Sequence, residues 1–231
     1  VAAPSLQPKL FIYQEQTSGW MLTGTENSFS SLGTSDFGAA MDFKNDTVVV
    51  GAPGHNGQGS VVLYRMINGS LAISQQLFAS DGGSGRRFGH SVCRAGSTLL
   101  VGDPNAEKVY LFELNGSVWT ETQILQAPQP QGGDHFGSAL SYSLQSGKLL
   151  VGSEGADQGA GQVHEYTWNG SSFVHQGVIS APDAAAGMRF GHDLSEGAGN
   201  VLIGAPLSRY SQNSASSSNH GSVYFNLSPG N

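Results

Sequence analysis

The sequence has little charge and almost no cysteine. Lys, Arg, Asp and Glu together make up 12% of its 231 residues, and the formal net charge is −7. An acidic chain whose one basic pair is Arg86-Arg87 does not fit a nucleic-acid partner, which requires a basic surface. The single cysteine, Cys93, excludes an internal disulfide, and we interpret it as a small buried hydrophobic residue on a strand. Stability must therefore come from a packed core.

Long apolar runs and helical stripes are also missing. No run approaches the roughly 20 residues of a membrane-spanning helix, and no window carries an apolar stripe at helical spacing. The chain does not begin with Met and has no apolar leader, so we expect a mature or excised product. It does have 33 glycines, set between short runs rich in Val, Leu, Tyr and Phe. This pattern favours strands joined by tight turns.

The stretch 87–128 shows the pattern most clearly. It contains four candidate strands in a row, SVC, STLLVG, KVYLFEL and VWTETQIL. A turn at 94–97, an Asp-Pro break and an Asn-Gly-Ser turn separate them, because these residues favour turn conformations over strands. The sequence therefore predicts a four-stranded antiparallel unit here.

Landmarks of this unit recur along the chain in constant order. Phe-Gly pairs stand 51, 48 and 54 residues apart, at Phe37-Gly38, Phe88-Gly89, Phe136-Gly137 and Phe190-Gly191. Each pair is followed by an apolar run ending in Gly (VVVGAP, LLVGDP, LLVGSE, VLIGAP) and then by a strand with a late aromatic residue. We therefore divide one domain, 1–231, into repeats 37–87, 88–135, 136–189 and 190–228.

The two ends of the chain carry parts of a repeat. Residues 9–25 match the last two strands of a unit, whereas the fourth repeat stops after its third strand. We expect the N-terminal hairpin either to close the last unit within the chain or to be donated to a neighbouring subunit. Donation would join subunits head to tail, and such heterologous contacts build filaments unless they close into a ring.

The Phe-Gly and Gly-Ala-Pro landmarks resemble FG-GAP repeats, the units of the β-propeller in integrin α subunits and in many bacterial and algal surface proteins. The resemblance covers residues 9–228 and implies an all-β propeller of four-stranded antiparallel blades. We expect each Phe to wedge between adjacent blades, its Gly to allow a close approach or positive φ, and the Pro to end the second strand.

Integrin-type repeats often hold calcium in the first hairpin of a blade, with a pattern such as Asp-x-Asp/Asn-x-Asp-Gly. The nearest approach here is MDFKNDT, with Asp42, Asn45 and Asp46. It does not supply the alternating oxygen ligands of a calcium loop. We therefore expect no calcium and no other metal or cofactor.

Five Asn-x-Ser/Thr sequons point to a secreted or cell-surface glycoprotein, because such sites are glycosylated on exposed loops of exported chains. Three of them occupy the same turn of successive repeats. A bacterial exported protein with unmodified turns is the alternative. The sequons lie at Asn45, Asn68, Asn115, Asn169 and Asn226.

Catalytic patterns are weak. His90 and His192 follow Phe-Gly and His135 precedes it, and we interpret them as polar positions near a seam between blades. Glu154 and Asp157 share one connection, where we expect solvated carboxylates. The sequence has no nucleophile turn, no His-Glu-x-x-His and no phosphate loop, so we expect no enzyme.

The sequence thus favours an extracellular, non-enzymatic adhesion or structural protein, with partners among its own copies, other surface proteins and glycans. A carbohydrate-binding propeller is the alternative, and its candidate ligand loops contain His55, Asn56 and Tyr210. A lesser alternative is a fragment of a larger integrin-like surface protein. No partner in nucleic acid or in the membrane interior is expected.

Overall fold

The computed structural model describes residues 9–26, 36–197, 199–208 and 221–225. These residues form seventeen strands and two single turns of helix, η1 (His55–Gly57) and α1 (Ala156–Gly159). Within them, no helix is both long enough and apolar enough to cross a membrane. The predicted sites Asn226 and Tyr210 lie outside the described residues.

The strands form one antiparallel sheet per repeat, which we call blades 1 to 4. Blade 1 contains β3 (Met41–Lys44), β4 (Thr47–Ala52), β5 (Ser60–Ile67) and β6 (Ser70–Leu77). Blade 2 contains β7 (Ser91–Ala95), β8 (Thr98–Asp103), β9 (Lys108–Asn115) and β10 (Val118–Leu125). Blade 3 contains β11 (Phe136–Ser143), β12 (Lys148–Ser153), β13 (Gln162–Trp168) and β14 (Phe173–Ile179). Blade 4 contains β15 (Asp193–Gly197), β16 (Asn200–Ala205) and β17 (Ser222–Phe225).

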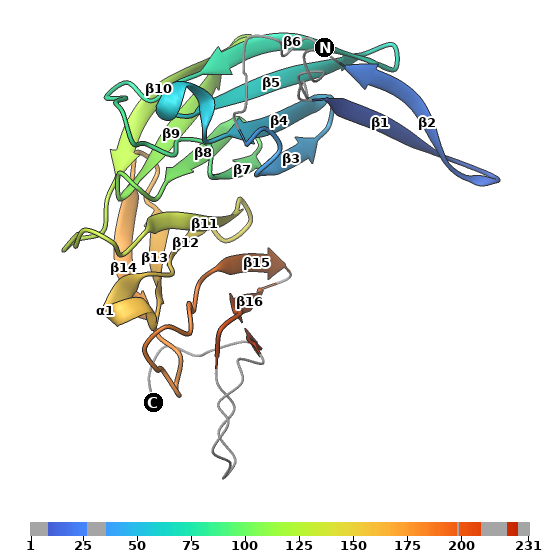
Figure 1. Cartoon of the computed structure of the whole chain (residues 1–231). Coiled ribbons are helices and arrows are strands. Elements are labelled where there is room, and N and C mark those ends of the chain that lie inside the picture. The colour runs from blue at the N-terminus through green and yellow to red at the C-terminus, as the bar shows by residue number, and fades with distance from the viewer. Residues whose placement is uncertain (1–8, 27–35, 198, 209–220, 226–231) are drawn as a thin grey trace, which may run out of the picture.

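The predicted all-β propeller fold is confirmed. The blades follow one another along an arc, with the first strand of each blade against the first strand of the next (Figure 1). The strands of 87–128 also fall where the sequence predicts, although β7 runs through Ala95 and leaves a shorter turn than expected. The second strands end at Ala52, Asp103 and Ala205, each directly before a proline. Proline has no N–H for the ladder, so these strands cannot continue.

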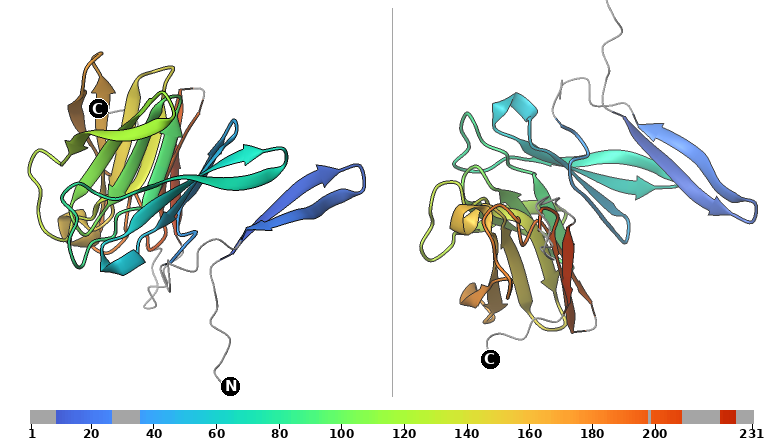
Figure 2. Two further views of the ribbon diagram at one scale, coloured as in Figure 1. Left: turned by 90° about the horizontal axis from the view of Figure 1, so that it is seen from above. Right: turned by 60° about the horizontal axis from the view of Figure 1, so that its bottom comes forward.

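The N-terminal residues form a separate hairpin of β1 (Leu10–Gln16) and β2 (Gly19–Glu26). It projects from blade 1 at one end of the arc, and blade 4 lies at the other end (Figures 1 and 2). Leu10 and Ile12 pack against a core cluster of blade 1 that includes Val50 and Tyr64. Among the described strands, β1 and β2 pair only with each other and β17 pairs only with β16. The hairpin therefore does not close blade 4 within this chain.

Each buried Phe of a Phe-Gly pair lies in the seam between its own blade and the preceding one. Phe88 is fully buried in a cluster with Val49 and Val61 of blade 1 and with Tyr110 of blade 2. Its ring meets the Tyr110 ring edge-on, with centroids 5.2 Å apart. The same edge-on contact recurs in blades 3 and 4, for Phe136–His164 at 5.3 Å and Phe190–Tyr224 at 5.2 Å. These seams have the wedge that the sequence predicts, and edge-on aromatic pairs add to its stability.

A pair of glycines brings neighbouring backbones together beside each wedge. Gly89 has φ +91°, and its carbonyl oxygen lies so close to Gly51 that an added Cβ at Gly51 would overlap it. Gly102 meets Gly137 in the same way, and Gly152 meets Gly191. The landmark glycines are therefore required by contact between blades, in addition to the positive φ that only glycine adopts at low cost.

Candidate functional site

The two ends of the blades differ in chemistry. In an up-and-down antiparallel blade, the turns between strands 1–2 and 3–4 lie at one end, and the connections between strands 2–3 and from blade to blade lie at the other. We call these ends the turn face and the connection face. The turn face consists of short loops that include Asn45 and Asn68. The connection face consists of the longer segments 53–59, 78–90, 104–107, 126–135, 154–161 and 180–192.

Segments of the connection face hold one another across the seams. The Gly57 carbonyl accepts the N–H groups of Gly85 (2.8 Å) and Arg86 (3.2 Å). Between blades 2 and 3, the Glu107 carboxylate accepts three backbone N–H groups, from Gly133 (2.9 Å), His135 (2.9 Å) and Phe136 (2.6 Å). Charged acceptors make the stronger hydrogen bonds. Glu107 therefore fixes the segment that leads into blade 3.

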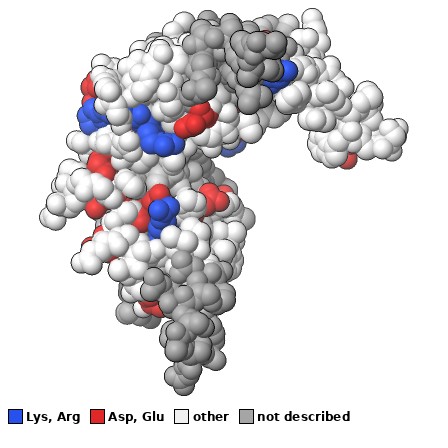
Figure 3. Space-filling view, viewed as in Figure 1, with Lys and Arg blue, Asp and Glu red and all other residues white. Residues whose placement is uncertain are grey.

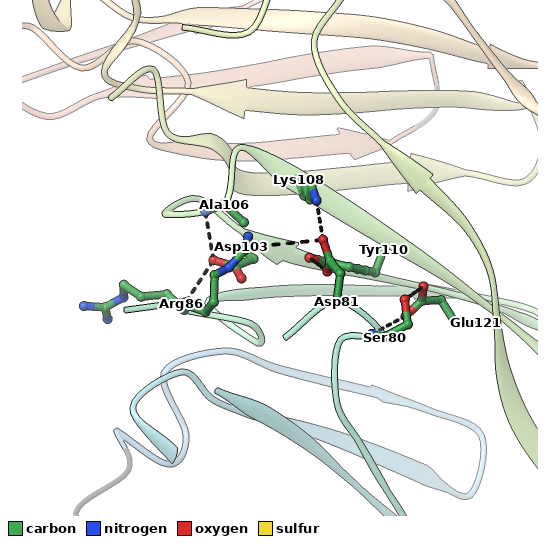
Figure 4. Close-up of polar contacts among 9 residues, drawn as sticks. Ser80, Asp81, Arg86, Asp103, Ala106, Lys108, Tyr110 and Glu121 are labelled. Atoms are coloured by element: carbon green, nitrogen blue, oxygen red, sulfur yellow. Dashed lines mark hydrogen bonds and ion pairs between the residues drawn. The ribbon is translucent and has the colours of Figure 1, made fainter. Parts of the chain in front are cut away.

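A tyrosine–aspartate contact closes two of the seams at this face. The Tyr110 hydroxyl donates to Asp81 (2.6 Å), which also binds the Lys108 ammonium (Figure 4). Partial burial acts to raise the pKa of Asp81, but the hydrogen bonds from Lys108 and Tyr110 outweigh it and the net pKa is lowered. The Tyr224 hydroxyl donates in the same way to Asp183 (2.6 Å) between blades 3 and 4.

Blade 3 lacks this contact and has a cleft instead. His164 occupies the position of Tyr110, as its ring contact with Phe136 shows. Gln129 ends the segment LQAPQ, at the position where Asp81 ends LFASD and Asp183 ends VISAPD. A cleft of about 470 Å³ opens here, within the size range of small-ligand sites. Its polar lining is Gln129, Gln131, Asp134, Asp157, Gln162, His164 and His175.

Two histidines form the inner wall of this cleft. Nδ1 of His164 and Nε2 of His175 lie 3.3 Å apart, so one ring donates a hydrogen bond to the other. Burial lowers the pKa of His164 to about 4 and also lowers the pKa of His175. Both rings are therefore neutral at pH 7. The cleft offers neutral imidazole, amide and carboxylate groups, which suit hydrogen bonding to hydroxyl or amide groups of a ligand.

Glu154 is not the solvated carboxylate that the sequence predicts. Its side chain is 13% exposed and lies 2.6 Å from Nδ1 of His192, 3.9 Å from Nδ1 of His135 and 4.0 Å from Arg189. His135, which directly precedes blade 3, and His192, which directly precedes blade 4, thus both lie beside the Glu154 carboxylate. Asp157, by contrast, is exposed and binds Gln162 in the wall of the cleft.

The remaining predicted positions divide between the two faces. The sequon residues Asn45, Asn68, Asn115 and Asn169 are all exposed on the turn face, Asn115 as the last residue of β9 and the others in the loops between strands. On the connection face, Asn56 is exposed at φ +51°, whereas His55 is buried and stacks near Phe78. The ligand loop expected at this point therefore presents Asn56 but not His55.

Two carboxylates of the segment that comes nearest to a calcium loop, Asp42 and Asp46, contact arginines of the protein. Asp42 accepts the Arg94 N–H at 2.7 Å, and Asp46 pairs with Arg65 at 3.0 Å. Across the described residues, no three His, Cys, Asp or Glu side chains are placed to hold a metal ion. Cys93 packs against the blade 2–blade 3 core, and burial raises its pKa to about 11. It is therefore a partly buried residue at the edge of this core, less enclosed than the sequence predicts.

Comparison with known proteins connects this architecture to a family. Residues 74–117 match the FG-GAP repeat. Integrin alpha-2 of Mus musculus is 30% identical over 152 residues, which cover 57% of this chain and 12% of integrin alpha-2. The chain thus spans about an eighth of the length of this relative.

Solved structures share the fold at low identity. A Bacteroides fragilis protein named as a 6-phosphogluconolactonase is 12% identical, with a TM-score of 0.64, over 86% of this chain and 57% of that chain. A Bacteroides uniformis protein of the same name is 11% identical, with a TM-score of 0.62, over 90% of this chain and 60% of that chain. Together, the repeated Phe-Gly seams and the blade architecture show that the chain is a β-propeller, in which residues 74–117 match the FG-GAP repeat.

Proposed function

We propose that this chain is an extracellular, N-glycosylated binding protein of the adhesion type, without enzymatic activity, whose partner engages the connection face. We also propose that it assembles head to tail through the ends of its arc. The likeness to integrin alpha-2 supports a surface location and a protein partner. The cleft between blades 2 and 3 would receive a polar group of that partner.

The distribution of the sequons carries the proposal. Asn45, Asn68, Asn115 and Asn169 lie on the turn face, and the cleft lined by His164 lies on the connection face. Glycans at all four positions would shield one end of the blades and leave the other end bare. A protein that binds through its connection face gains solubility from such glycans without losing access to its partner.

The polar groups of the connection face favour binding over catalysis. Asp81 binds Lys108, Glu107 accepts backbone N–H groups of the segment that leads into the next blade, and Glu154 contacts His192 and Arg189. Such carboxylates stabilise the face and leave few groups to act on a substrate. The cleft itself combines neutral imidazoles with amides, which serve recognition by hydrogen bonding.

A glycan placed on the connection face tests the proposal. Gln58→Thr completes a sequon at the exposed Asn56, whereas Gln58→Ala removes the same side chain without doing so. The chain would be secreted from a eukaryotic host, and mass measurement before and after peptide N-glycosidase treatment would count its glycans. Cells of the organism that produces the protein would then be applied to surfaces coated with each variant.

We expect wild type and Gln58→Ala to carry glycans on the turn face and to hold cells. The Gln58→Thr variant should carry one more glycan and lose adhesion, and Asn115→Gln should lose one glycan and keep adhesion. A wild-type chain without glycans at the turn-face sequons, or a surface coated with wild type that holds no cells, would refute the proposal. Strong binding to one defined glycan on an array, abolished by Gln58→Thr, would favour the carbohydrate-binding alternative instead.

A further inference from the structure

The outer face of blade 4 has the composition of a seam but no neighbour. In the ladder between β16 and β17, Leu202 pairs with Phe225 and Gly204 pairs with Val223. The same ladder positions in blade 1 hold Val49 with Leu63 and Gly51 with Val61. Blade 4 therefore carries the residue pattern that receives a following blade.

Exposure separates this face from the complete seams. Leu202, Val223 and Phe225 are 43%, 70% and 60% exposed. Their blade 1 counterparts, Val49, Val61 and Leu63, are each 0% exposed. The blade 2 counterparts, Leu100, Val109 and Leu111, are 0%, 0% and 2% exposed. A terminal repeat that stands alone normally has a polar outer face, so an apolar one indicates a surface that is covered in use.

The opposite end of the arc shows the complementary gap. On β3, Met41 and Phe43 are 66% and 58% exposed, whereas Val92, the blade 2 counterpart of Met41, packs in a seam. A cleft of about 360 Å³ separates β3 from the hairpin β1–β2. The hairpin covers the outer part of blade 1 and leaves the space beside β3 open. The face of the projecting hairpin seen in Figure 3 is mostly uncharged.

The glycines at the two ends of the arc each lack the partner that they have in a complete seam. The nearest atoms to an added Cβ at Gly204 belong to Asp193, at 3.6–3.7 Å, and one at Gly38 would meet nothing within 4 Å among the described residues. In each complete seam the matching glycines touch. Gly204 and Gly38 are thus the two halves of one seam contact.

We propose that a second copy of this chain docks blade 1 onto blade 4, which places its Gly38 against Gly204 and its Met41 and Phe43 against β15 and β16. The hairpin β1–β2 then supplies the two outer strands of the shared blade, and β15–β16 supply the two inner ones. β1 takes the edge of β16 that β17 otherwise holds. The inference rests on the proposed head-to-tail assembly and names its contact surface.

β1 has the length of a third strand. It contains seven residues, and the third strands of complete blades, β5, β9 and β13, contain eight, eight and seven. A strand of this length can pair along the edge of β16 and cover an edge that would otherwise stay open. The contact is heterologous, so repeated docking extends a chain of copies unless the rotation closes it.

Gly204→Ala tests the contact with little effect on the fold, because its Cβ has ordinary surroundings in the single chain. Gly197→Ala is the matched control, since it adds a methyl group to the same blade where nothing lies within 4 Å. Leu202→Asp is a second variant, which places a charge on the exposed face of β16, a strand that stays in the proposed contact. Sedimentation velocity across the micromolar range would report assembly, and thermal unfolding would verify the fold.

We expect wild type and Gly197→Ala to sediment as species larger than a monomer, growing with concentration. Gly204→Ala and Leu202→Asp should raise the apparent Kd by at least about tenfold. A wild-type chain that remains monomeric, or variants that assemble as wild type does, would overturn the inference. A chain that adheres to cells but stays monomeric contradicts the proposed assembly and leaves the binding role intact. A chain that assembles equally well with both variants contradicts only the contact surface named here, and one that assembles but does not adhere contradicts only the binding role.

Discussion

The glycine contact between blades leads to opposite expectations for two equivalent substitutions. Gly102→Ala places a methyl group onto the Gly137 carbonyl oxygen and the Ser91 hydroxyl. The Ser91 hydroxyl donates to that same carbonyl at 2.7 Å, and the bond is buried. Relieving the overlap requires β8 and β11 to separate. Gly204→Ala, at the same position of blade 4, requires no movement.

The magnitude follows from the interactions that are lost. Overpacking a well-packed site costs about 1–3 kcal/mol, and a lost buried hydrogen bond costs about 1 kcal/mol. Reduced entropy of the unfolded chain returns about 0.4–1 kcal/mol. We therefore expect Gly102→Ala to lower the free energy of unfolding by about 1–3.5 kcal/mol. Gly204→Ala should leave it unchanged or raise it slightly.

Urea unfolding followed by tryptophan fluorescence and circular dichroism would measure both variants at a protein concentration where the chain is monomeric. Gly152→Ala, which overlaps the Gly191 carbonyl, would serve as an independent repeat of the test. Equal unfolding midpoints for Gly102→Ala and Gly204→Ala would refute the argument that these glycines are required by contact between blades.

Three other perturbations have defined outcomes. The pKa of His164 is lowered to about 4, so protonation opposes folding: stability should be complete above pH 6.5 and fall by up to about 3 kcal/mol as the pH drops toward 4. His164→Tyr should remove most of that fall in urea titrations at several pH values. Phe136→Ala should cost about 3–5 kcal/mol of unfolding free energy, since the ring is fully buried, and Phe37→Ala, at a partly buried position, should cost clearly less in the same assay. Glu107→Gln should speed hydrogen exchange at the N–H groups of residues 133–136, and unchanged exchange there would show that the carboxylate does not hold this segment.

The fold could be predicted because its requirements fall on short, repeated sequence patterns. A seam needs a large aromatic ring, a glycine next to it in the sequence and a second glycine in the preceding blade. In the seam between blades 1 and 2 these residues are Phe88, Gly89 and Gly51. The strand-ending prolines follow from the missing N–H. Each of these features is local or recurs at a fixed spacing, so a single sequence shows it.

The polar contacts between blades could not be predicted in the same way. Asp81 and Tyr110 are 29 residues apart and Glu154 and His192 are 38 apart, and no local pattern states that they meet. The cleft was signalled only by a difference between repeats, a histidine where Tyr110 and Tyr224 stand. Comparing repeats position by position would have found His164, but not its contact with His175.

The uniform construction of the seams bears on how such a protein can change over evolutionary time. Every complete seam joins its blades through the same ring and the same glycine pair. A gene duplication or deletion that spans one whole repeat joins an existing outer face to an existing inner face. Blades can thus be gained or lost without inventing a new contact, while the loops at either end diverge freely.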